Sequence, residues 1–240
     1  RIKGFGPKTE QALRAGLARL RAGGEQRMRL GEAEEVAEPL RAYLAEADGV
    51  KAIDVAGSYR RRRETVGDLD ILVACADSGP VMQRFVAHEE VAEVVSRGDT
   101  RATVRLDSGL QVDLRVVPAA SYGAALHYFT GSRAHNVAVR KRGVARGYKI
   151  NEYGVYDGEA VIAGEREQAV FAAVGLAWVP PELREDRGEI AAAEAGDLPE
   201  LVTTDRIRGD LHCHTRATDG ADDLAGLAAA GRERGYEYLA

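Results

Sequence analysis

The apolar positions of the chain follow a helical period in some stretches and a strand pattern in others. Within residues 31–47, Val36, Leu40 and Leu44 recur every four positions, which predicts a helix that covers a sheet. Pro39 lies inside this pattern and is expected to kink or break the helix. Further apolar patterns predict a helix at 80–88 and strands at 50–56, 66–74, 101–106 and 110–117.

The second half of the chain begins with a long helical and basic stretch. Residues 119–146 predict helix, and Gly147 is expected to cap its C-terminal end. Residues 150–163 predict a short hairpin around the turn Asp157-Gly158, and 165–174 predict another helix. Residues 182–205 are mostly charged and rich in alanine, which predicts a linker with room for one helix.

The first residues combine a glycine-rich turn with a helical pattern. Gly4-Phe5-Gly6-Pro7 precedes apolar residues at helical spacing, so a tight turn is expected to lead into a helix. This turn is similar to a helix-hairpin-helix motif, in which the backbone amides around Gly4 and Gly6 would bind a DNA phosphate without reading sequence. The alternative is a plain glycine turn between two packed helices.

Composition places the chain among globular proteins of one or two domains. The 240 residues are 45% hydrophobic, which is enough for a sizeable core. No apolar run of about 18 residues and no secretory leader pattern occurs, so neither membrane insertion nor secretion is expected. The two cysteines, Cys75 and Cys213, are too few for a disulfide framework, and a reduced cytoplasmic protein is therefore expected.

The formal net charge of −5 argues against a nucleic-acid-binding protein, but the distribution of charge answers this objection. Residues 131–150 contain six basic residues and no acidic residue, and 60–63 are four arginines. Acidic residues gather instead in 32–48 and 182–200. The pattern is compatible with a basic groove on an acidic body, although a solvated charged face would have the same composition.

Three aspartates are the strongest candidates for chemistry. Asp68 and Asp70 lie two apart at the start of a predicted strand, so both should point to the same face of a sheet. Asp113 lies inside another apolar strand. Carboxylates of this kind hold hard divalent cations, which activate and stabilise oxygens in phosphoryl transfer. The alternative is that the aspartates only cap backbone groups at the strand ends.

Three separated motifs resemble the family X DNA polymerases of the nucleotidyltransferase superfamily. They are Gly57-Ser58-Tyr59-Arg60-Arg61 with Gly67-Asp68-Leu69-Asp70, then Tyr128-Phe129-Thr130-Gly131-Ser132 with Asn136 and Arg140, and finally Lys149-Ile150-Asn151-Glu152-Tyr153-Gly154. The resemblance implies an α+β fold. It divides the chain into a helix-hairpin-helix remnant (1–24), a nucleotidyltransferase palm with a mixed sheet (25–118), an α/β thumb (119–181) and a linker (182–205).

The same resemblance assigns roles to the site residues. Asp68, Asp70 and Asp113 would hold two Mg²⁺ or Mn²⁺ ions and carry the catalysis. Strand alternation, and not the resemblance, places Arg115 on the face of Asp113, where it is expected to pair with a metal-site carboxylate in the inactive state. The nucleotide-binding set would be Gly57, Ser58 and Arg61 at the phosphates, Tyr128, Phe129 and Gly131 beside the sugar, and Asn136 at the base. DNA would be bound by Gly4, Gly6, Arg140, Lys141, Arg142 and Lys149.

The implied activity is that of a template-dependent DNA polymerase that fills short gaps in repair. Its partners would be gapped or primer-template DNA and a deoxynucleoside triphosphate. The protein is expected to be a monomer that does not bind a membrane and that lies in the bacterial cytoplasm at the nucleoid. Two alternatives remain open at this point: a template-independent nucleotidyltransferase, and a DNA-binding scaffold with an inactive palm.

The last segment carries a second candidate metal site. His212 and His214 are two apart at a predicted strand end, so both imidazoles should share one face, and Asp219 follows. This resembles the first motif of the PHP phosphoesterase domain, an α/β-barrel, which would begin within 206–240. The resemblance implies Mn²⁺, Fe²⁺ or Zn²⁺ at a completed site and a 3′-5′ exonuclease in a protein longer than this chain.

Overall fold

The structure is a computed structural model that describes Gly6, Glu10 and residues 27–240. The chain divides into two compact units, of which the first runs to Leu198 and the second is Pro199–Ala240. The predicted helix-hairpin-helix segment lies outside the described residues apart from Gly6, whose carbonyl accepts a hydrogen bond from the amide of Glu10 at 3.0 Å.

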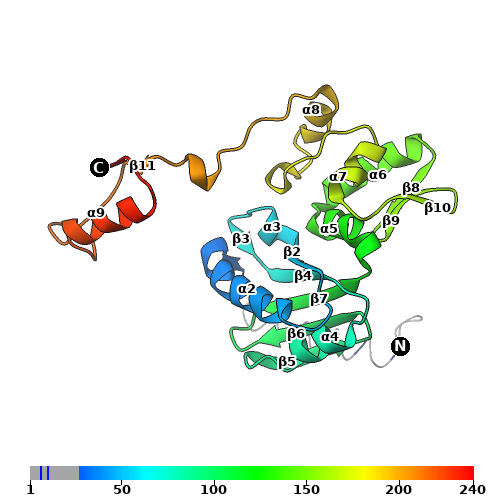
Figure 1. The fold of residues 1–240 in the computed structure, drawn as a ribbon, viewed down its shortest axis with the longest axis horizontal. Helices are drawn as coiled ribbons and strands as arrows, with labels where there is room; N and C mark the ends of the chain where they lie inside the picture. Colours follow the sequence, from blue (N-terminus) through cyan, green and yellow to red (C-terminus); the bar gives the residue numbers. More distant parts are fainter. Residues whose placement is uncertain (1–5, 7–9, 11–26) are drawn as a thin grey trace. The chain divides into compact units, whose positions relative to one another are not determined.

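The first unit is built on a five-stranded mixed sheet (Figure 1). Its only parallel pair is β4 with β7, and the other neighbours are antiparallel. In spatial order, the strands are β2 (Ala52–Val55), β4 (Asp68–Ala74), β7 (Gln111–Val117), β6 (Arg101–Leu106) and β5 (Val91–Arg97). A separate two-stranded pair joins β1 (Met28–Arg29) to β3 (Thr65–Val66).

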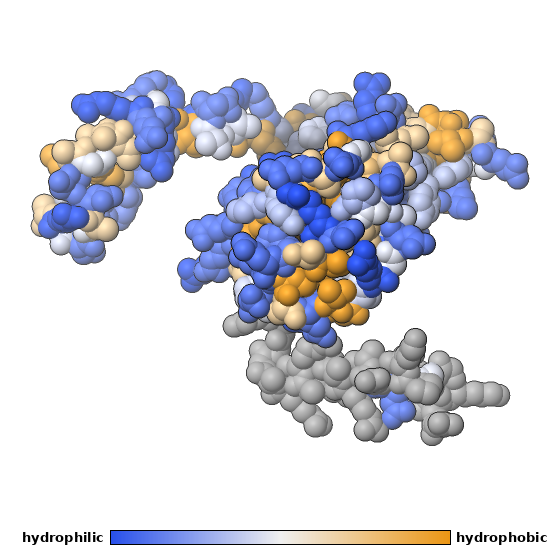
Figure 2. Space-filling model, turned by 60° about the horizontal axis from the view of Figure 1, so that its bottom comes forward, coloured by the Kyte–Doolittle hydropathy of each residue, from blue (hydrophilic) through white to orange (hydrophobic). Residues whose placement is uncertain are grey.

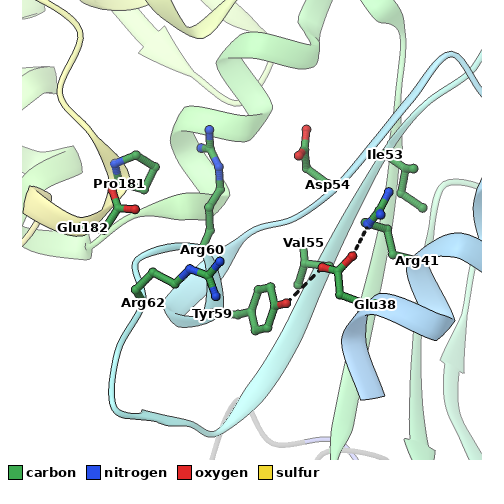
Figure 3. A pocket seen from close by; sticks show the side chains of 10 residues that line it. All are labelled: Glu38, Arg41, Ile53, Asp54, Val55, Tyr59, Arg60, Arg62, Pro181 and Glu182. Carbon is green, nitrogen blue, oxygen red and sulfur yellow. Dashed lines mark hydrogen bonds and ion pairs between the residues drawn. The ribbon is translucent and has the colours of Figure 1, made fainter. Parts of the chain in front are cut away.

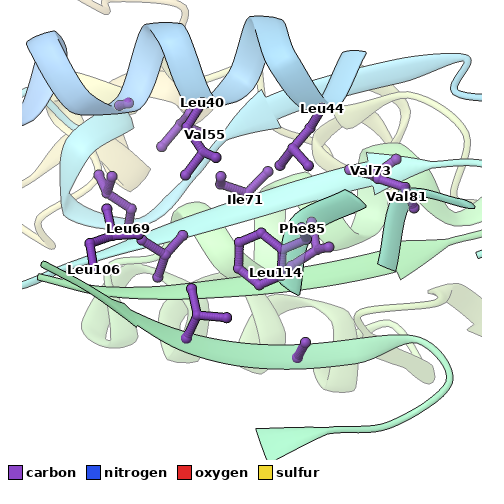
Figure 4. Close-up of a cluster of buried hydrophobic side chains, with 14 of the residues drawn as sticks. Leu40, Leu44, Val55, Leu69, Ile71, Val73, Val81, Phe85, Leu106 and Leu114 are labelled. Carbon is purple, nitrogen blue, oxygen red and sulfur yellow. The ribbon is translucent and has the colours of Figure 1, made fainter. Parts of the chain in front are cut away.

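One face of the large sheet forms the main core with α2 (Leu30–Ala45) and α4 (Gly79–Val86). Leu40 and Leu44 of α2 pack over Ile71 of β4, and Phe85 of α4 joins the same cluster (Figure 4). The apolar residues of β4 and β7 alternate with residues on the opposite face, as the pleat requires. The aspartates therefore lie on the face that this core does not use.

The opposite face is partly covered by α5 (Tyr122–Thr130), which follows a 3-10 turn, η1 (Ala119–Ser121). A small core of Ala125 and Leu126 from α5 packs against Leu72 of β4 and Val117 of β7. The predicted helical stretch is interrupted at Gly131, whose φ of 68° is a conformation that glycine adopts readily. A second helix, α6 (Arg133–Ala145), begins two residues later. Two helices thus replace the single one that the sequence pattern predicted.

The rest of the first unit packs around a second core. A three-stranded antiparallel sheet consists of β8 (Tyr148–Asn151), β9 (Gly154–Asp157) and β10 (Ala160–Ala163). It packs with α5, α6 and α7 (Glu167–Ala173), and the chain continues through η2 (Pro181–Leu183) to α8 (Glu189–Ala195). Ala193 of α8 belongs to this core, so the first part of the predicted linker is packed structure.

The second unit is small and is described by itself. Its elements are η3 (Thr204–Arg206), β11 (Gly209–Asp210), α9 (Leu224–Glu233) and β12 (Tyr238–Leu239). The two short strands pair in parallel, and Asp223 caps α9 by accepting a hydrogen bond from the amide of Gly226 at 2.8 Å.

The predicted α+β fold is confirmed, and two further local differences have a physical reason. Helix α2 continues through Pro39, because Pro39 and Glu35, whose carbonyl loses a partner, are both exposed to solvent. Strand β5 was not predicted, since six of its seven residues are exposed and its sequence lacks the apolar alternation of a half-buried strand.

Polar residues predominate on the face shown in Figure 2, with smaller apolar areas between them. Exposed large apolar side chains among the described residues include Val94, Val95, Val144, Val161 and Leu211. Within the described part of the chain, no helix combines the length and the apolar character needed to cross a membrane.

Candidate active site

The three predicted aspartates come together on the open face of the large sheet. Asp68 and Asp70 start β4, Asp113 lies in β7, and these two strands are parallel neighbours in which Asp70 pairs directly with Asp113. The pleat places all three side chains on one face. Asp68 is exposed, whereas Asp113 is only 9% exposed. The sheet thus presents a graded cluster of carboxylates that runs from solvent into the protein.

The cluster is electrostatically strained at Asp70. Burial, followed by the neighbouring carboxylates of Asp68 and Asp113, raises the pKa of Asp70 from its ordinary 3.8 to about 7. The guanidinium groups of Arg115 and Arg61 oppose this shift but do not cancel it. A site that destabilises its own negative charge in this way would gain from a bound cation.

The pKa of Asp70 leads to a prediction about stability and pH. The folded-state pKa of about 7 lies above the ordinary 3.8, so between these pH values the folded protein binds more protons at Asp70 than the unfolded chain does. Protonation of Asp70 therefore adds to the unfolding free energy at low pH, and this added stability is lost as pH rises through 7. In urea titrations without metal, the stability of Asp70→Asn relative to wild type should therefore be higher at pH 8 than at pH 5. An unchanged difference would contradict the assignment.

Both carboxylate oxygens of Asp113 are held by neutral donors. The hydroxyl of Thr103 in β6 donates to Oδ1 at 2.5 Å, and the side-chain amide of Gln111 donates to Oδ2 at 2.9 Å. Thr103 is directly opposite Asp113 in the antiparallel pair and is buried. The guanidinium of Arg101 is more distant, with Nη2 3.9 Å from Oδ1. Sequence analysis missed Thr103 because strand pairing is not visible in the sequence.

The Gly-Ser turn lies directly beside Asp70. Gly57 begins the short helix α3 (Gly57–Arg60) with a φ of 63°, and a Cβ at this position would lie 2.5 Å from Oδ2 of Asp70. A side chain is excluded there by both conformation and space. Ser58 follows on the same helix and is half-buried, so the predicted phosphate-binding turn and the carboxylates are adjacent.

Arg61 extends from this turn toward the residues after α5. Its Nε donates to Glu185 Oε1 at 2.9 Å, and its Nη1 donates to the carbonyl of Thr130 at 2.6 Å. A Cβ on Gly131 would lie 3.3 Å from the same Nη1, so glycine allows the guanidinium to approach this close. The structure therefore brings together Arg61 and Gly131, which are 70 residues apart in the sequence.

The aromatic pair at the end of α5 contacts the cluster through Arg115. The guanidinium carbon of Arg115 lies 4.4 Å from the ring centroid of Phe129, and the rings of Tyr128 and Phe129 meet edge to face with centroids 5.1 Å apart. Asn136 of α6 donates from Nδ2 to the carbonyl of Tyr128 at 2.7 Å. The predicted sugar and base contacts thus lie on two connected helices.

The predicted DNA-binding residues differ in their surroundings. Arg140 and Lys141 on α6 and Lys149 on β8 are exposed. Arg142 instead forms a bidentate ion pair with Glu194 of α8, with Nη1 and Nη2 at 2.9 and 2.5 Å from the carboxylate oxygens. The pair is charge-assisted, so Glu194 would compete with a DNA phosphate for this guanidinium.

Arg60, for which the sequence suggested no role, anchors α3 to the second core. Its guanidinium makes a bidentate ion pair with Glu167 of α7 at 2.8 and 3.0 Å and donates to the Thr130 hydroxyl at 2.7 Å. Glu167 also accepts from Arg184 at 2.6 Å and from the Trp178 indole at 2.8 Å. Burial would raise the pKa of Glu167, but the two guanidinium groups outweigh burial and hold this pKa well below its usual range.

A polar pocket of about 440 Å³ is lined by residues of α2, β2 and α3 together with Arg62, Pro181 and Glu182 (Figure 3). Tyr59 donates to Glu38 at 3.1 Å, and Arg41 donates to the same carboxylate at 2.9 Å. Burial is the main cause, and the hydrogen bond to Glu38 the second, of a rise in the pKa of Tyr59 to about 12. Three arginines balance three carboxylates on the walls, which are Glu38, Arg41, Ile53, Asp54, Val55, Tyr59, Arg60, Arg62, Pro181 and Glu182.

The aspartates supply the donor set of a divalent-metal site without forming a finished one. Among the described residues, no group of three or more His, Cys, Asp or Glu side chains is positioned to hold a metal ion. Carboxylate oxygens are nevertheless the ligands that Mg²⁺ and Mn²⁺ prefer, and the mutual repulsion at Asp70 would be relieved by a cation. The residues therefore fit such an ion, with side-chain adjustment.

The second unit contains the other predicted metal-binding residues. Nε2 of His212 and Nε2 of His214 lie 2.8 Å apart, with the rings stacked at a centroid distance of 4.8 Å. Nδ1 of His214 lies 2.5 Å from Oδ1 of Asp219, and this hydrogen bond lowers the pKa of the carboxyl. The two imidazoles are in contact, and His214 also contacts Asp219.

Two family models cover most of the first unit. The DNA polymerase beta palm matches residues 27–116, and the DNA polymerase beta thumb matches residues 125–185. The structure of Leishmania infantum polymerase beta in a ternary P/T complex superposes with a TM-score of 0.60 at 20% identity, over 77% of this chain and 95% of that chain. This structural likeness concerns the fold alone.

Curated relatives point to the same family. Over its whole length, the chain is 35% identical to the DNA polymerase/3′-5′ exonuclease PolX of Bacillus subtilis (strain 168) and covers 42% of it. It is 28% identical to DNA polymerase lambda of Rattus norvegicus over 66% of this chain and 33% of that protein. The chain thus spans less than half the length of these relatives. With palm and thumb in order and the carboxylate cluster in place, the chain belongs to the family X DNA polymerases.

Proposed function

We propose that the protein is a template-dependent DNA polymerase that adds deoxynucleotides to a primer 3′-hydroxyl in short gaps. The observation that supports this most directly is the register of β4 and β7, which pairs Asp70 with Asp113 beside Asp68. Three carboxylates on one open sheet face, next to a Gly-Ser turn and a guanidinium, match the needs of phosphoryl transfer from a triphosphate. Family membership supports the same reaction.

The palm residues would have distinct tasks. Asp68, Asp70 and Asp113 would hold two Mg²⁺ or Mn²⁺ ions, which neutralise the phosphates and activate the attacking oxygen when bound. Ser58 and Arg61 would hold phosphate oxygens, for which a hydroxyl and a planar guanidinium are suited. Glu185 would compete with the phosphate for Arg61, since Nε of Arg61 donates to that carboxylate.

The thumb residues would select and position the nucleotide. Tyr128 and Phe129 would line the sugar, and Gly131 would allow the triphosphate to approach the backbone closely. Asn136 would contact the incoming base, because its Oδ1 is buried without a hydrogen-bond partner among the described residues. The backbone amides around Gly4 and Gly6 would hold a DNA phosphate.

Exposed basic residues should make DNA binding depend on salt. Arg140, Lys141 and Lys149 would neutralise phosphates and release counterions, and each contact adds about 0.9 to the negative slope of log K against log salt. Arg140→Ala is expected to reduce this slope by about 0.9 in fluorescence titrations of gapped DNA. Arg232→Ala, which removes an exposed arginine of α9, serves as the matched control and should leave the slope unchanged. Equal slopes in wild type and Arg140→Ala would exclude a phosphate contact.

Primer extension on a duplex with a one-nucleotide gap tests the proposed activity. Each of the four deoxynucleotides is offered separately with Mg²⁺ or Mn²⁺, and only the one complementary to the template base should be added. Addition of any nucleotide irrespective of the template would indicate a template-independent transferase. Binding of the gapped duplex without extension would indicate a DNA-binding scaffold.

We propose a second activity for the longer protein of which this chain would be a part. Residues 206–240 would begin a PHP α/β-barrel in which His212, His214 and Asp219 hold Mn²⁺, Fe²⁺ or Zn²⁺, and the completed domain would be a 3′-5′ exonuclease. The contacts among these three side chains support this, as does the whole-chain match to a relative named a 3′-5′ exonuclease. The protein would act as a monomer at the nucleoid in a bacterial cytoplasm.

A further inference from the structure

Resting on the proposed polymerase function, we propose that Thr103 and Gln111 are positioning residues that fix the carboxylate of Asp113 for metal binding and for the primer hydroxyl. Neither residue belongs to the motifs by which the sequence resembles its family. Thr103 comes from β6 and Gln111 from β7, so the carboxylate is held from two strands.

The geometry accounts for the lone pairs of Asp113. An ionised carboxylate offers about four acceptor positions on its two oxygens. Thr103 uses one on Oδ1, at 2.5 Å, and Gln111 uses one on Oδ2, at 2.9 Å. One position then remains on each oxygen, which suits one metal ligand bond and one hydrogen bond from the attacking hydroxyl. Held at both oxygens, the carboxylate cannot rotate without breaking a bond.

Burial strengthens this arrangement. Thr103 is 6% exposed and Asp113 is 9% exposed, so water has little access with which to replace the hydroxyl. Hydrogen bonds to a charged acceptor are also stronger than those between neutral groups. Both donors are uncharged, so they orient the carboxylate without competing as cations for its site. Residues that orient a metal ligand typically change metal affinity or activity by about 10- to 100-fold when removed.

The isosteric change Thr103→Val tests the inference, because it removes the hydroxyl and retains the volume. Single-turnover nucleotide addition should slow by about 10-fold or more, with little change in the nucleotide concentration that gives half the maximal rate. Mn²⁺ affinity of the chain without DNA, measured by electron paramagnetic resonance, should fall by a similar factor. Thr103→Ser keeps a hydroxyl, so this variant should have a rate of nucleotide addition and an Mn²⁺ affinity close to those of wild type.

Three further measurements complete the design. Gln111→Leu should lower Mn²⁺ affinity as Thr103→Val does, and Thr203→Val, which alters an exposed threonine of the second unit, should leave it unchanged. Thermal unfolding shows which variants are folded. If Thr103→Val does not fold, Gln111→Leu and Thr103→Ser test the positioning role in its place. Wild-type Mn²⁺ affinity in the folded donor-deleted variants would overturn the positioning role. A wild-type chain that binds Mn²⁺ but never extends a primer would instead overturn the proposed function.

Discussion

Replacing Asp113 with alanine is expected to lower the rate of nucleotide addition by more than about a hundredfold while leaving gapped-DNA binding little changed. Asp113 is paired in register with Asp70 and is buried in the carboxylate cluster, so its loss would misplace both the ion and the attacking oxygen. The carboxylate repels DNA phosphates if it acts on them at all, and its removal therefore gives no reason for weaker binding. Single-turnover extension and fluorescence titration of the same gapped duplex measure the two effects.

Asp107 provides the matched control for this experiment. It lies in the turn between β6 and β7, six residues before Asp113, and it is exposed. Asp107→Ala should retain nearly the wild-type rate, because Asp107 lies in the exposed turn and not on the paired strands that carry the three aspartates. Extension by Asp113→Ala at more than about a tenth of the wild-type rate would contradict the catalytic assignment.

Glu167→Gln is expected to lower the free energy of unfolding by about 3 to 5 kcal/mol, the typical cost of removing one partner from a buried ion pair. Glu167 is 5% exposed and is the shared acceptor for Arg60, Arg184 and the Trp178 indole. Arg184 has no exposed side-chain surface, so loss of the negative charge would leave its guanidinium buried beside a neutral group. Urea titration followed by tryptophan fluorescence measures the effect.

The effect of salt and a control substitution at a neighbouring glutamate distinguish this buried network from surface ion pairs. The destabilisation should persist at high salt, because buried charges are screened far less than exposed ones. Glu165→Gln changes an exposed glutamate two residues earlier and should cost less than about 1 kcal/mol. If Glu167→Gln were as mild as this control, the network would contribute little to stability.

The network also connects the two cores of the first unit. Arg60 lies on α3 next to the Gly-Ser turn, whereas Glu167 and Arg184 pack with α7 and the segment after it. Arg61, the next residue, contacts Glu185, which follows Arg184 directly. Arg60 and Arg184 therefore share the acceptor Glu167, and Arg61 contacts the residue that follows Arg184. These contacts tie the segment at the Gly-Ser turn to Glu167 and Glu185.

His127 and His135 are two buried histidines on either side of the Tyr128–Ser132 motif. His127 is fully enclosed, and burial together with the charge of Arg184 lowers its pKa to about 3. His135 is buried too, with Nδ1 2.7 Å from Glu189 of α8. Both belong to the second core, where Phe171 contacts each ring.

Short-range patterns were sufficient to predict the two strands that carry the aspartates. The alternation of Leu69, Ile71 and Val73 with Asp68 and Asp70 follows from the pleat, so the shared face of the two aspartates is a local property of β4. The same reasoning puts Gln111 and Asp113 on one face of β7. The break or kink expected at Pro39 is absent from α2. The expectation considered the hydrogen bond that proline removes, but not that water can reach the unpaired carbonyl of Glu35.

By itself, the sequence determined the family, the order of the elements and the identity of the three carboxylates, because motif spacing, strand alternation and turn residues are encoded within a few neighbouring positions. Only the tertiary structure decided which partners those residues meet. The pairing of Thr103 with Asp113 depends on the register of β6 against β7, and Arg60 reaches Glu167 across 107 positions of sequence. Such contacts form because docked cores bring distant segments together, and no local pattern records which charges will then be buried side by side.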